Sequence, residues 1–216
     1  MLKGKKLSIL GDSVSTYKGV SNDEGANRTT VFNPYFYRPE FPLEKTYWSI
    51  ILEKYGMSLC VNNSWSGGNL SGRDDESAGV NRASHLSRNN GEKPDFVIVF
   101  MGINDLGRGI DIDIFAKDYE KALLTVKEKY PIATVCCVNM PDRDPILKAR
   151  AEKINDAIED AVCKMGEGYF IADLFNSRLN NDFYYDNTVD GLHPDEDGMR
   201  IIAEVICEAI DKNINC

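Results

Sequence analysis

Residues 7–16 read LSILGDSVST, and this stretch decides the fold. Leu7 to Leu10 is mostly apolar, and a glycine, an aspartate and a serine follow where the chain must turn. Short runs that are apolar throughout, rather than alternating with polar residues, are typical of strands buried on both faces of a parallel sheet. The stretch therefore predicts a buried parallel strand that ends in a polar turn at Ser13.

Four further runs share this pattern: Leu59–Val61, Phe96–Phe100, Thr134–Val138 and Tyr169–Asp173. Stretches with helical spacing separate them. The first is TYWSIILEKYG with Thr46 as N-cap, the second DIFAKDYEKALLTVKEKYP starting at Asp113, and the third DPILKARAEKINDAIEDAVCKMG with Asp144 as N-cap. A last helix carries Met199, Ile202, Val205, Ile206 and Ala209 on one side. This alternation predicts a three-layer α/β/α sandwich around a five-stranded parallel sheet.

The chain is expected to form one domain, residues 1–216, because it contains no repeat, low-complexity tract or linker. One connection is unusual. Residues 17–47 form an aromatic-rich loop insertion, longer than most connections in compact domains, and such loops are often functional. Phe32, Tyr35 and Phe36 are candidates for the wall of a substrate pocket beside Ser13, and inward packing as a minor core remains an equal alternative.

Composition excludes several classes of partner. The chain carries 34 acidic and 25 basic side chains, a net charge of −9, which argues against nucleic acid and against an anionic membrane surface. No apolar run is long enough to insert into a membrane, and the first residues lack the pattern of a signal peptide. The six cysteines include no CxxC pair. We therefore expect a cytoplasmic protein, unless a leader has been removed.

Polar loops adjoin the predicted strands and the last helix. Ser13 follows the first strand, Gly67 lies in NNSWSGGN after the second, Asn104 lies in MGIND after the third, and DGLHPD precedes the last helix. In open parallel sheets, ligands bind outside the carboxyl ends of the strands. The four loops can therefore converge on one site at that edge.

A serine is a weak nucleophile unless a neighbouring base takes its proton and a third group orients that base. Only two histidines are present. His85 lies in a polar stretch and is expected at the surface, whereas His193 follows Asp190 by three residues, with Gly191 between them. The arrangement predicts a catalytic triad of Ser13, Asp190 and His193.

Ester cleavage also needs donors for the oxygen that becomes negative in the tetrahedral intermediate. The candidates are the backbone N–H groups of Ser13 and Gly67 and the side-chain amide of Asn104, with Asp12 as a further substrate contact. Each residue also has a structural interpretation: Ser13 could cap a helix, and Asn104 and Asp105 could form a turn, Asp105 being the more structural. One catalytic site explains all four loops together.

These four blocks resemble those of the SGNH (GDSL-type) hydrolases: GDSV with Ser13, NNSWSGG with Gly67, GIND with Asn104, and the DxxH of Asp190 and His193. The resemblance implies a flavodoxin-like sheet, a small-molecule ester substrate, hydrolysis through an acyl-serine, and no cofactor. GDSV replaces GDSL, a conservative apolar change. The sequence leaves open the acyl group, the alcohol and the oligomeric state.

Two alternatives belong to other classes of protein. The stretch HPDEDGMRIIAE places Asp195, Asp197, Gly198 and Glu204 at EF-hand-like positions. A histidine would be the first ligand, and helical spacing starts at Met199, so no metal site is expected. The second alternative is a non-catalytic flavodoxin-like protein that binds an acyl ligand, or a flavin phosphate on DSVSTYKG. Neither kind of binding would require Asn104 and the DxxH pair.

Overall fold

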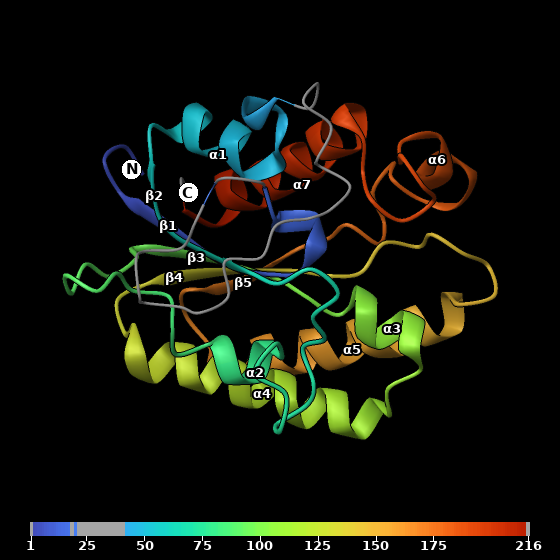
Figure 1. Ribbon diagram of the computed structural model, residues 1–216, viewed down its shortest axis with the longest axis horizontal. Coiled ribbons are helices and arrows are strands. Elements are labelled where there is room, and N and C mark those ends of the chain that lie inside the picture. The colour runs from blue at the N-terminus through green and yellow to red at the C-terminus, as the bar shows by residue number, and fades with distance from the viewer. Residues whose placement is uncertain (1, 18–19, 21–41, 215–216) are drawn as a thin grey trace.

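A computed structural model describes residues 2–17, 20 and 42–214 of the chain. Its centre is one parallel sheet with strand order β2-β1-β3-β4-β5 (Figure 1). The strands are β1 (Lys6–Gly11), β2 (Ser58–Ser64), β3 (Phe96–Phe100), β4 (Thr134–Val138) and β5 (Tyr169–Ala172). The five predicted strands are confirmed, and their order is that of flavodoxin-like folds.

Helices cover both faces of the sheet (Figure 1). One face is covered by α1 (Tyr47–Tyr55) and α7 (Glu196–Ile214), and the other by α2 (Gly79–Arg82), α4 (Ile112–Lys129) and α5 (Lys148–Met165). Shorter pieces lie near the carboxyl ends of the strands: the 3-10 turn η1 (Ser13–Ser15), α3 (Ile103–Arg108) and α6 (Asn181–Asp186), whereas the 3-10 turn η3 (Leu43–Lys45) precedes α1. The predicted three-layer α/β/α sandwich is therefore confirmed.

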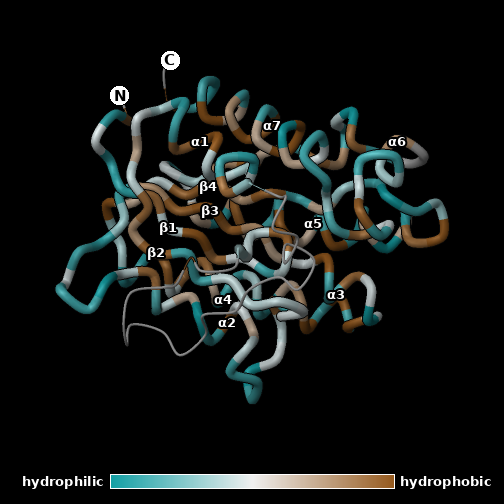
Figure 2. Tube along the Cα trace, turned by 45° about the horizontal axis from the view of Figure 1, so that its top comes forward, coloured by the Kyte–Doolittle hydropathy of each residue, from teal (hydrophilic) through white to brown (hydrophobic). Residues whose placement is uncertain are grey.

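The apolar strand runs form the core. All five side chains of β3 are buried, and Figure 2 shows hydrophobic colour along the central strands, with hydrophilic loops around them. A strand with helices on both faces has no polar side, so uniform apolar character rather than alternation is the expected pattern. Residues 62–64 extend β2 beyond its predicted end even though they are polar.

Helix boundaries follow the local capping groups. Thr46 caps α1 as predicted, since its side chain accepts a hydrogen bond from Ser49 N. The predicted start of α4 at Asp113 is wrong: the helix begins at Ile112, because Asp111 accepts from the N–H groups of residues 113 and 114. The predicted cap of α5 at Asp144 is also wrong, because Asp144 accepts from Ile146 N in a separate turn before the helix.

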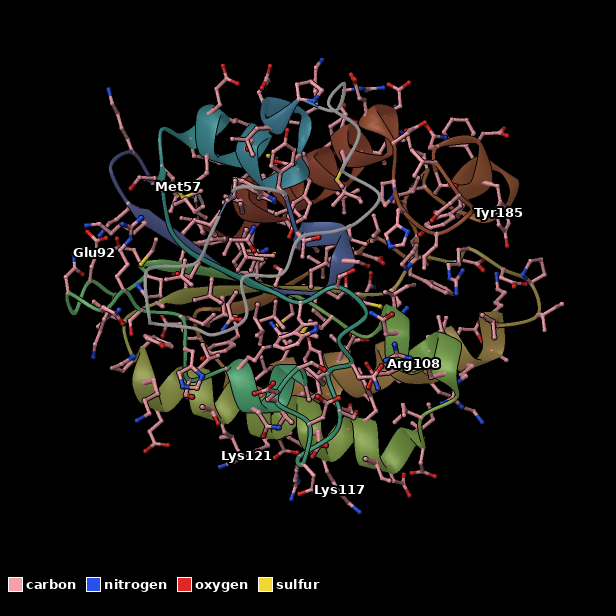
Figure 3. All side chains as sticks on the ribbon, in the orientation of Figure 1. Met57, Glu92, Arg108, Lys117, Lys121 and Tyr185 are labelled. Carbon is pink, nitrogen blue, oxygen red and sulfur yellow. The ribbon has the colours of Figure 1, made fainter. Side chains whose placement is uncertain are left out.

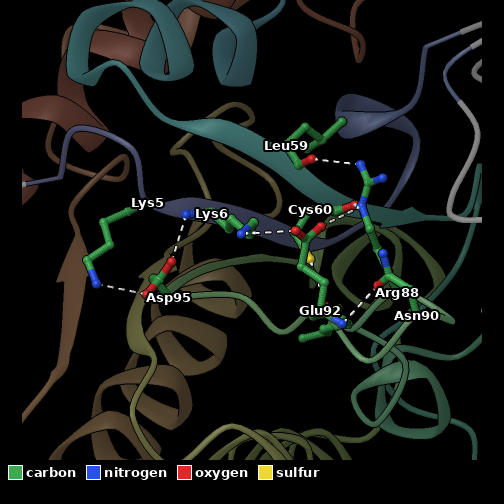
Figure 4. A network of polar contacts seen from close by, with 9 residues as sticks. Lys5, Lys6, Leu59, Cys60, Arg88, Asn90, Glu92 and Asp95 are labelled. Atoms are coloured by element: carbon green, nitrogen blue, oxygen red, sulfur yellow. Dashed lines mark hydrogen bonds and ion pairs between the residues drawn. The ribbon is translucent and has the colours of Figure 1, made fainter.

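The amino ends of the strands carry a network of polar contacts (Figure 4). Asp95 bonds Lys5 Nζ and Lys6 N at 2.9 Å each, and Glu92 pairs with Lys6 at 2.9 Å and with Arg88 at 3.1 Å. The Arg88 guanidinium also donates to two carbonyl groups of β2. Partly exposed ion pairs contribute little individually to stability. The role of these contacts is therefore structural: they join the amino ends of the strands to the segment of residues 88–95.

Among the described residues, none of the helices has the length and apolar character needed to cross a membrane. Of the cysteines within residues 2–17, 20 and 42–214, four are buried thiols and Cys163 is exposed. The buried ones are Cys60, Cys136, Cys137 and Cys207. Burial raises the pKa of the Cys137 thiol to about 12, so this side chain packs as a small apolar group.

Candidate active site

Ser13 lies directly beyond the carboxyl end of β1, in η1. Asp12 caps this turn, with Oδ1 accepting a hydrogen bond from Val14 N at 3.0 Å. Gly11 makes the sharp entry possible, because a Cβ there would lie 2.5 Å from Ser15 Oγ and 2.7 Å from Ser64 Oγ. The end of β1 therefore requires glycine, and the next two residues place the Ser13 hydroxyl at the sheet edge.

His193 and Asp190 meet Ser13 from the loop before α7. His193 Nε2 lies 2.9 Å from Ser13 Oγ, and His193 Nδ1 lies 2.8 Å from Asp190 Oδ2. The three side chains form one hydrogen-bonded chain across 180 residues of sequence. Ser13 and His193 are almost fully buried. The structure thus brings together the three residues of the predicted triad.

A tight turn fixes the His193 loop. Gly191 has φ +82°, a conformation that favours glycine, and Asp190 Oδ1 accepts from the backbone N–H groups of Leu192 and His193. Partial burial would raise the pKa of Asp190, but these bonds and the His193 ring outweigh it, so the pKa is lowered. The carboxylate is therefore held in its charged form, facing the imidazole.

A glycine turn after β2 forms the second side of the site. Gly67 has φ +74°, and Gly68 N donates to Trp65 O at 3.0 Å. A Cβ on Gly68 would lie 2.9 Å from Ser77 O, so a larger residue would push the turn away from its support. The described residues provide no acceptor for Gly67 N–H, which leaves this donor available at the edge of the site.

Asn104 lies in the first turn of α3, not in the loop that the sequence predicted. Its Nδ2 donates to Gly68 O at 3.0 Å and lies 3.4 Å from Asp12 Oδ2. The neighbouring Asp105 is fully buried and accepts from Leu70 N and Ser71 N. Asp105 thus anchors the loop after the glycine turn, and Asn104 joins that turn to the start of η1.

Asp12 is almost fully buried, and its carboxylate faces the protein donors just described. Burial raises its pKa to about 7, although the bond from Val14 N and the positive charge of Arg82 oppose the rise. Asp12 was expected as a substrate contact, and here it supports the backbone on which Ser13 lies. Phe32, Tyr35 and Phe36, the other expected contacts, lie outside the described residues.

Arg82 is a residue of this site that sequence reasoning missed. It is buried, and its guanidinium donates to Gly11 O at 3.0 Å, to Asn63 O at 2.6 Å and to Ser77 O at 2.8 Å. Burial lowers its pKa to about 10, against the opposing charge of Asp12. One buried cation therefore ties together the ends of β1 and β2, from which the two predicted catalytic loops leave.

The calcium alternative does not fit this structure. Helix α7 begins at Glu196, so most of the EF-hand-like stretch is helical rather than a loop. Asp195 Oδ1 accepts from Gly198 N, and the other two acidic residues pair with Arg200. The described part of the chain has no cluster of three or more side chains suited to a metal. His85 is exposed, as predicted.

Similarity to known proteins extends over nearly the whole chain. The sequence matches the family model of the GDSL-like lipase/acylhydrolases over residues 5–210. No curated protein matches it significantly. Among solved structures, a protein from Bacteroides ovatus assigned as a GDSL-like lipase aligns with TM-score 0.72 and 22% identity, covering 97% of this chain and 99% of that one.

Two further structures are similar in fold. A Bacteroides uniformis protein with the same assignment has TM-score 0.70 and 24% identity, with 97% of this chain and 96% of that chain covered. A family two carbohydrate esterase from Clostridium thermocellum, in complex with cellohexaose, has TM-score 0.68 and 18% identity, with 98% and 65% covered. Since the family match spans nearly the whole sequence, this protein belongs to the GDSL-like lipase/acylhydrolase family.

Proposed function

We propose that this protein is a serine esterase that hydrolyses a carboxylic ester through an acyl-serine intermediate. The hydrogen-bonded chain from Ser13 through His193 to Asp190 carries this proposal. A serine hydroxyl 2.9 Å from an imidazole nitrogen, whose other nitrogen faces a carboxylate, is the arrangement that activates a serine for nucleophilic attack.

The chemistry proceeds in two steps. Ser13 Oγ attacks the carbonyl carbon of the ester while His193 Nε2 takes the serine proton, and the imidazolium then returns that proton to the departing alcohol oxygen. A water molecule attacks the acyl-serine in the same way, releasing the acid and restoring Ser13. Asp190 Oδ2 accepts a hydrogen bond from the Nδ1–H group of His193, which keeps Nε2 available as the base and stabilises the charged ring.

Three donors support the negative oxygen of each tetrahedral intermediate: the N–H groups of Ser13 and Gly67, and the Asn104 amide. Gly67 N–H has no acceptor among the described residues, as an oxyanion donor requires. Of the two contacts of Asn104 Nδ2, the one to Asp12 Oδ2 is long at 3.4 Å. The Asn104 N–H that faces Asp12 can therefore donate to the substrate oxygen instead, with little loss of hydrogen-bond energy.

The substrate is an acyl ester or an acetylated carbohydrate. Similarity in fold to the carbohydrate esterase makes acetylated sugars worth testing beside simple acyl esters. The flavin alternative is weaker, because Asp12 already occupies the Val14 N–H that a bound phosphate would use, and a carboxylate would repel that phosphate. Hydrolysis consumes only water, so the proposal needs no cofactor.

The test is turnover of p-nitrophenyl esters of increasing chain length, with acetylated sugars in parallel. Ser13→Ala should lower kcat by roughly 10⁴-fold or more while the circular dichroism spectrum stays unchanged. Ser15→Ala is the matched control, because Ser15 lies in the same turn but its hydroxyl bonds Tyr47 rather than the histidine. Equal turnover by Ser13→Ala and the control, or no turnover of any ester, would contradict the proposal.

A further inference from the structure

One face of α3 carries both Asn104 and a positive charge. Asn104, Gly107 and Arg108 are spaced i, i+3 and i+4, so they lie on the same side of this short helix. Arg108 Nη1 donates to Asn69 Oδ1 at 2.7 Å, and its Nη2 lies 3.4 Å from the position that a Cβ on Gly67 would occupy. The guanidinium is therefore held against the glycine of the proposed oxyanion site. Figure 3 labels Arg108 at α3.

A second arginine approaches the same face of the helix. Arg143 Nη2 lies 3.8 Å from the position of a Cβ on Gly107, so the missing side chain of this glycine leaves room for the guanidinium. The Arg143 charge is also near Tyr184: burial raises the pKa of this tyrosine, and the arginine opposes the rise. Tyr184 Oη donates to Leu192 O, next to His193. Arg143 thus lies between α3 and the histidine loop.

No acidic side chain in the part of the chain that the structure describes neutralises either guanidinium. Four arginines pair with carboxylates, namely Arg73, Arg88, Arg178 and Arg200. Arg82 and Arg150 form no ion pair with a described residue either, but both donate to backbone carbonyl groups, and Arg150 Nε is also buried without a partner there. Within the described residues, Arg108 and Arg143 form no ion pair, and Arg143 Nε is buried with no hydrogen-bond partner. In a chain with a net charge of −9, two uncompensated arginines beside the proposed site require an explanation.

An anionic part of the substrate would explain them. A guanidinium binds carboxylate and phosphate groups through paired N–H donors, and a buried donor without a partner costs free energy until a ligand satisfies it. A chain this acidic repels anions over most of its surface, so an anionic substrate needs a local positive site to be held. Asn104 and Arg108 are about one helical turn, ~6 Å, apart along α3.

We propose that Arg108 and Arg143 form an anion subsite, and that the preferred ester carries a carboxylate or phosphate group a few bonds from its scissile carbonyl. This inference rests on the proposed esterase function and narrows its substrate class. The anion lies against the Asn104 face of α3 while the ester carbonyl faces Asn104 and Gly67. The subsite contributes to binding more than to the chemical step, because its contacts are the same before and during the reaction.

The experiment compares esters that differ only in charge. p-Nitrophenyl hemisuccinate and p-nitrophenyl methyl succinate place the charge difference on the acyl side, whereas 4-acetoxybenzoate and its methyl ester place it on the alcohol side. The third pair tests phosphate. It consists of two serine dipeptides that are both O-acetylated on one serine, and only one of them is phosphorylated on the other serine. In at least one pair, the wild-type kcat/KM should be ten or more times higher for the charged ester, mainly through a lower KM.

Substitutions of the two arginines test whether they cause the preference for charged esters. Arg108→Gln and Arg143→Gln should each lower the charged-to-neutral ratio of kcat/KM at least threefold, and Arg108→Lys should retain part of it. Lys121→Gln is the matched control, because it removes the same charge from the exposed surface of α4 (Figure 3). A ratio near one in every pair, a ratio that survives both arginine variants, or an equal fall in Lys121→Gln would overturn the subsite.

The two proposals fail in different ways. Hydrolysis of neutral and charged esters at similar rates leaves the esterase function in place and removes only the anion subsite. If no ester of either kind is hydrolysed, the esterase function fails and the subsite fails with it. A charged-to-neutral ratio that falls as salt is added agrees with the subsite, because ions screen the attraction between the guanidinium groups and the substrate.

Discussion

Replacing Asp12 by asparagine should make the protein more stable at high pH, and the structure gives the size of the effect. Burial raises the pKa of Asp12 to about 7 from an ordinary value of 3.8. The folded state therefore holds this proton more tightly than the unfolded chain does, and ionising the carboxyl destabilises the fold. A shift of about 3 pKa units corresponds to about 4 kcal/mol of destabilisation by the ionised carboxylate. This destabilisation is absent below pH ~4, grows as the pH rises and is complete above pH ~7.

Asparagine cannot ionise, and its side-chain oxygen can still accept from Val14 N. The assay is urea unfolding of the wild type and Asp12→Asn at pH 5 and pH 8, where the difference between the two proteins cancels the other titrating groups. The free energy of unfolding of the variant, relative to wild type, should increase by about 3 kcal/mol from pH 5 to pH 8. The same difference at both pH values would refute the assignment of a buried, titrating carboxyl to Asp12.

Three further predictions concern neighbouring residues. Asn104→Ala should lower kcat by ~10²- to 10³-fold with a smaller change in KM, as loss of one oxyanion donor does elsewhere; steady-state kinetics with an unchanged kcat would exclude that role. Asp190→Asn should lower kcat by about 10²-fold or more because the ring loses the acceptor that orients it, and His193→Ala should lower it further; equal activity of all three proteins would contradict a triad. Arg82→Lys should lower kcat at least tenfold, roughly, since an ammonium group cannot reproduce a planar fork of donors to three carbonyl groups; a lower melting temperature with normal kcat would limit Arg82 to stability.

The sequence was sufficient for the sheet because its strands are apolar on both faces. Its prediction failed at the end of β2, where Asn62, Asn63 and Ser64 are buried in the strand. The two asparagines find partners in distant segments: Asn62 donates to Ser15 O, and Asn63 donates to the carbonyls of residues 82 and 85. Ser64 Oγ in turn donates to Asn62 Oδ1. A hydropathy pattern cannot show such partners, so polar residues end a predicted strand too early.

The same limit applies to helix starts. Asp111, Asp113 and Asp144 are all acceptable caps by residue type, and only the backbone decides which of them receives an N–H group. The stretch GIND contains glycine, asparagine and aspartate, which are typical of turns, yet it starts α3. That helix is held by Asp105 bonding two N–H groups more than 30 residues away, a tertiary contact that local propensity does not include.

In the candidate site, the histidine and its aspartate could be predicted because the chain has few histidines. With two histidines in the chain, one of them three residues after an aspartate, the choice of His193 and Asp190 needed little more than spacing. Arginines offer no comparable signal. Arg82 bonds backbone carbonyl groups, which every residue has, so the sequence does not mark its partners. Arg143 becomes a neighbour of α3, and thus of Arg108, only once β4 lies beside β3 in the sheet.

The central claim is that Ser13 is the nucleophile, and covalent labelling tests it most directly. A fluorophosphonate reacts with an activated serine, forming a phosphorus–oxygen bond to Oγ as fluoride leaves. Intact mass and peptide mapping should show one adduct per chain, on Ser13. The Ser13→Ala variant should remain unlabelled, and His193→Ala should be labelled much more slowly because the base is gone. An adduct on a different serine, or equal labelling rates in wild type and His193→Ala, would contradict the account.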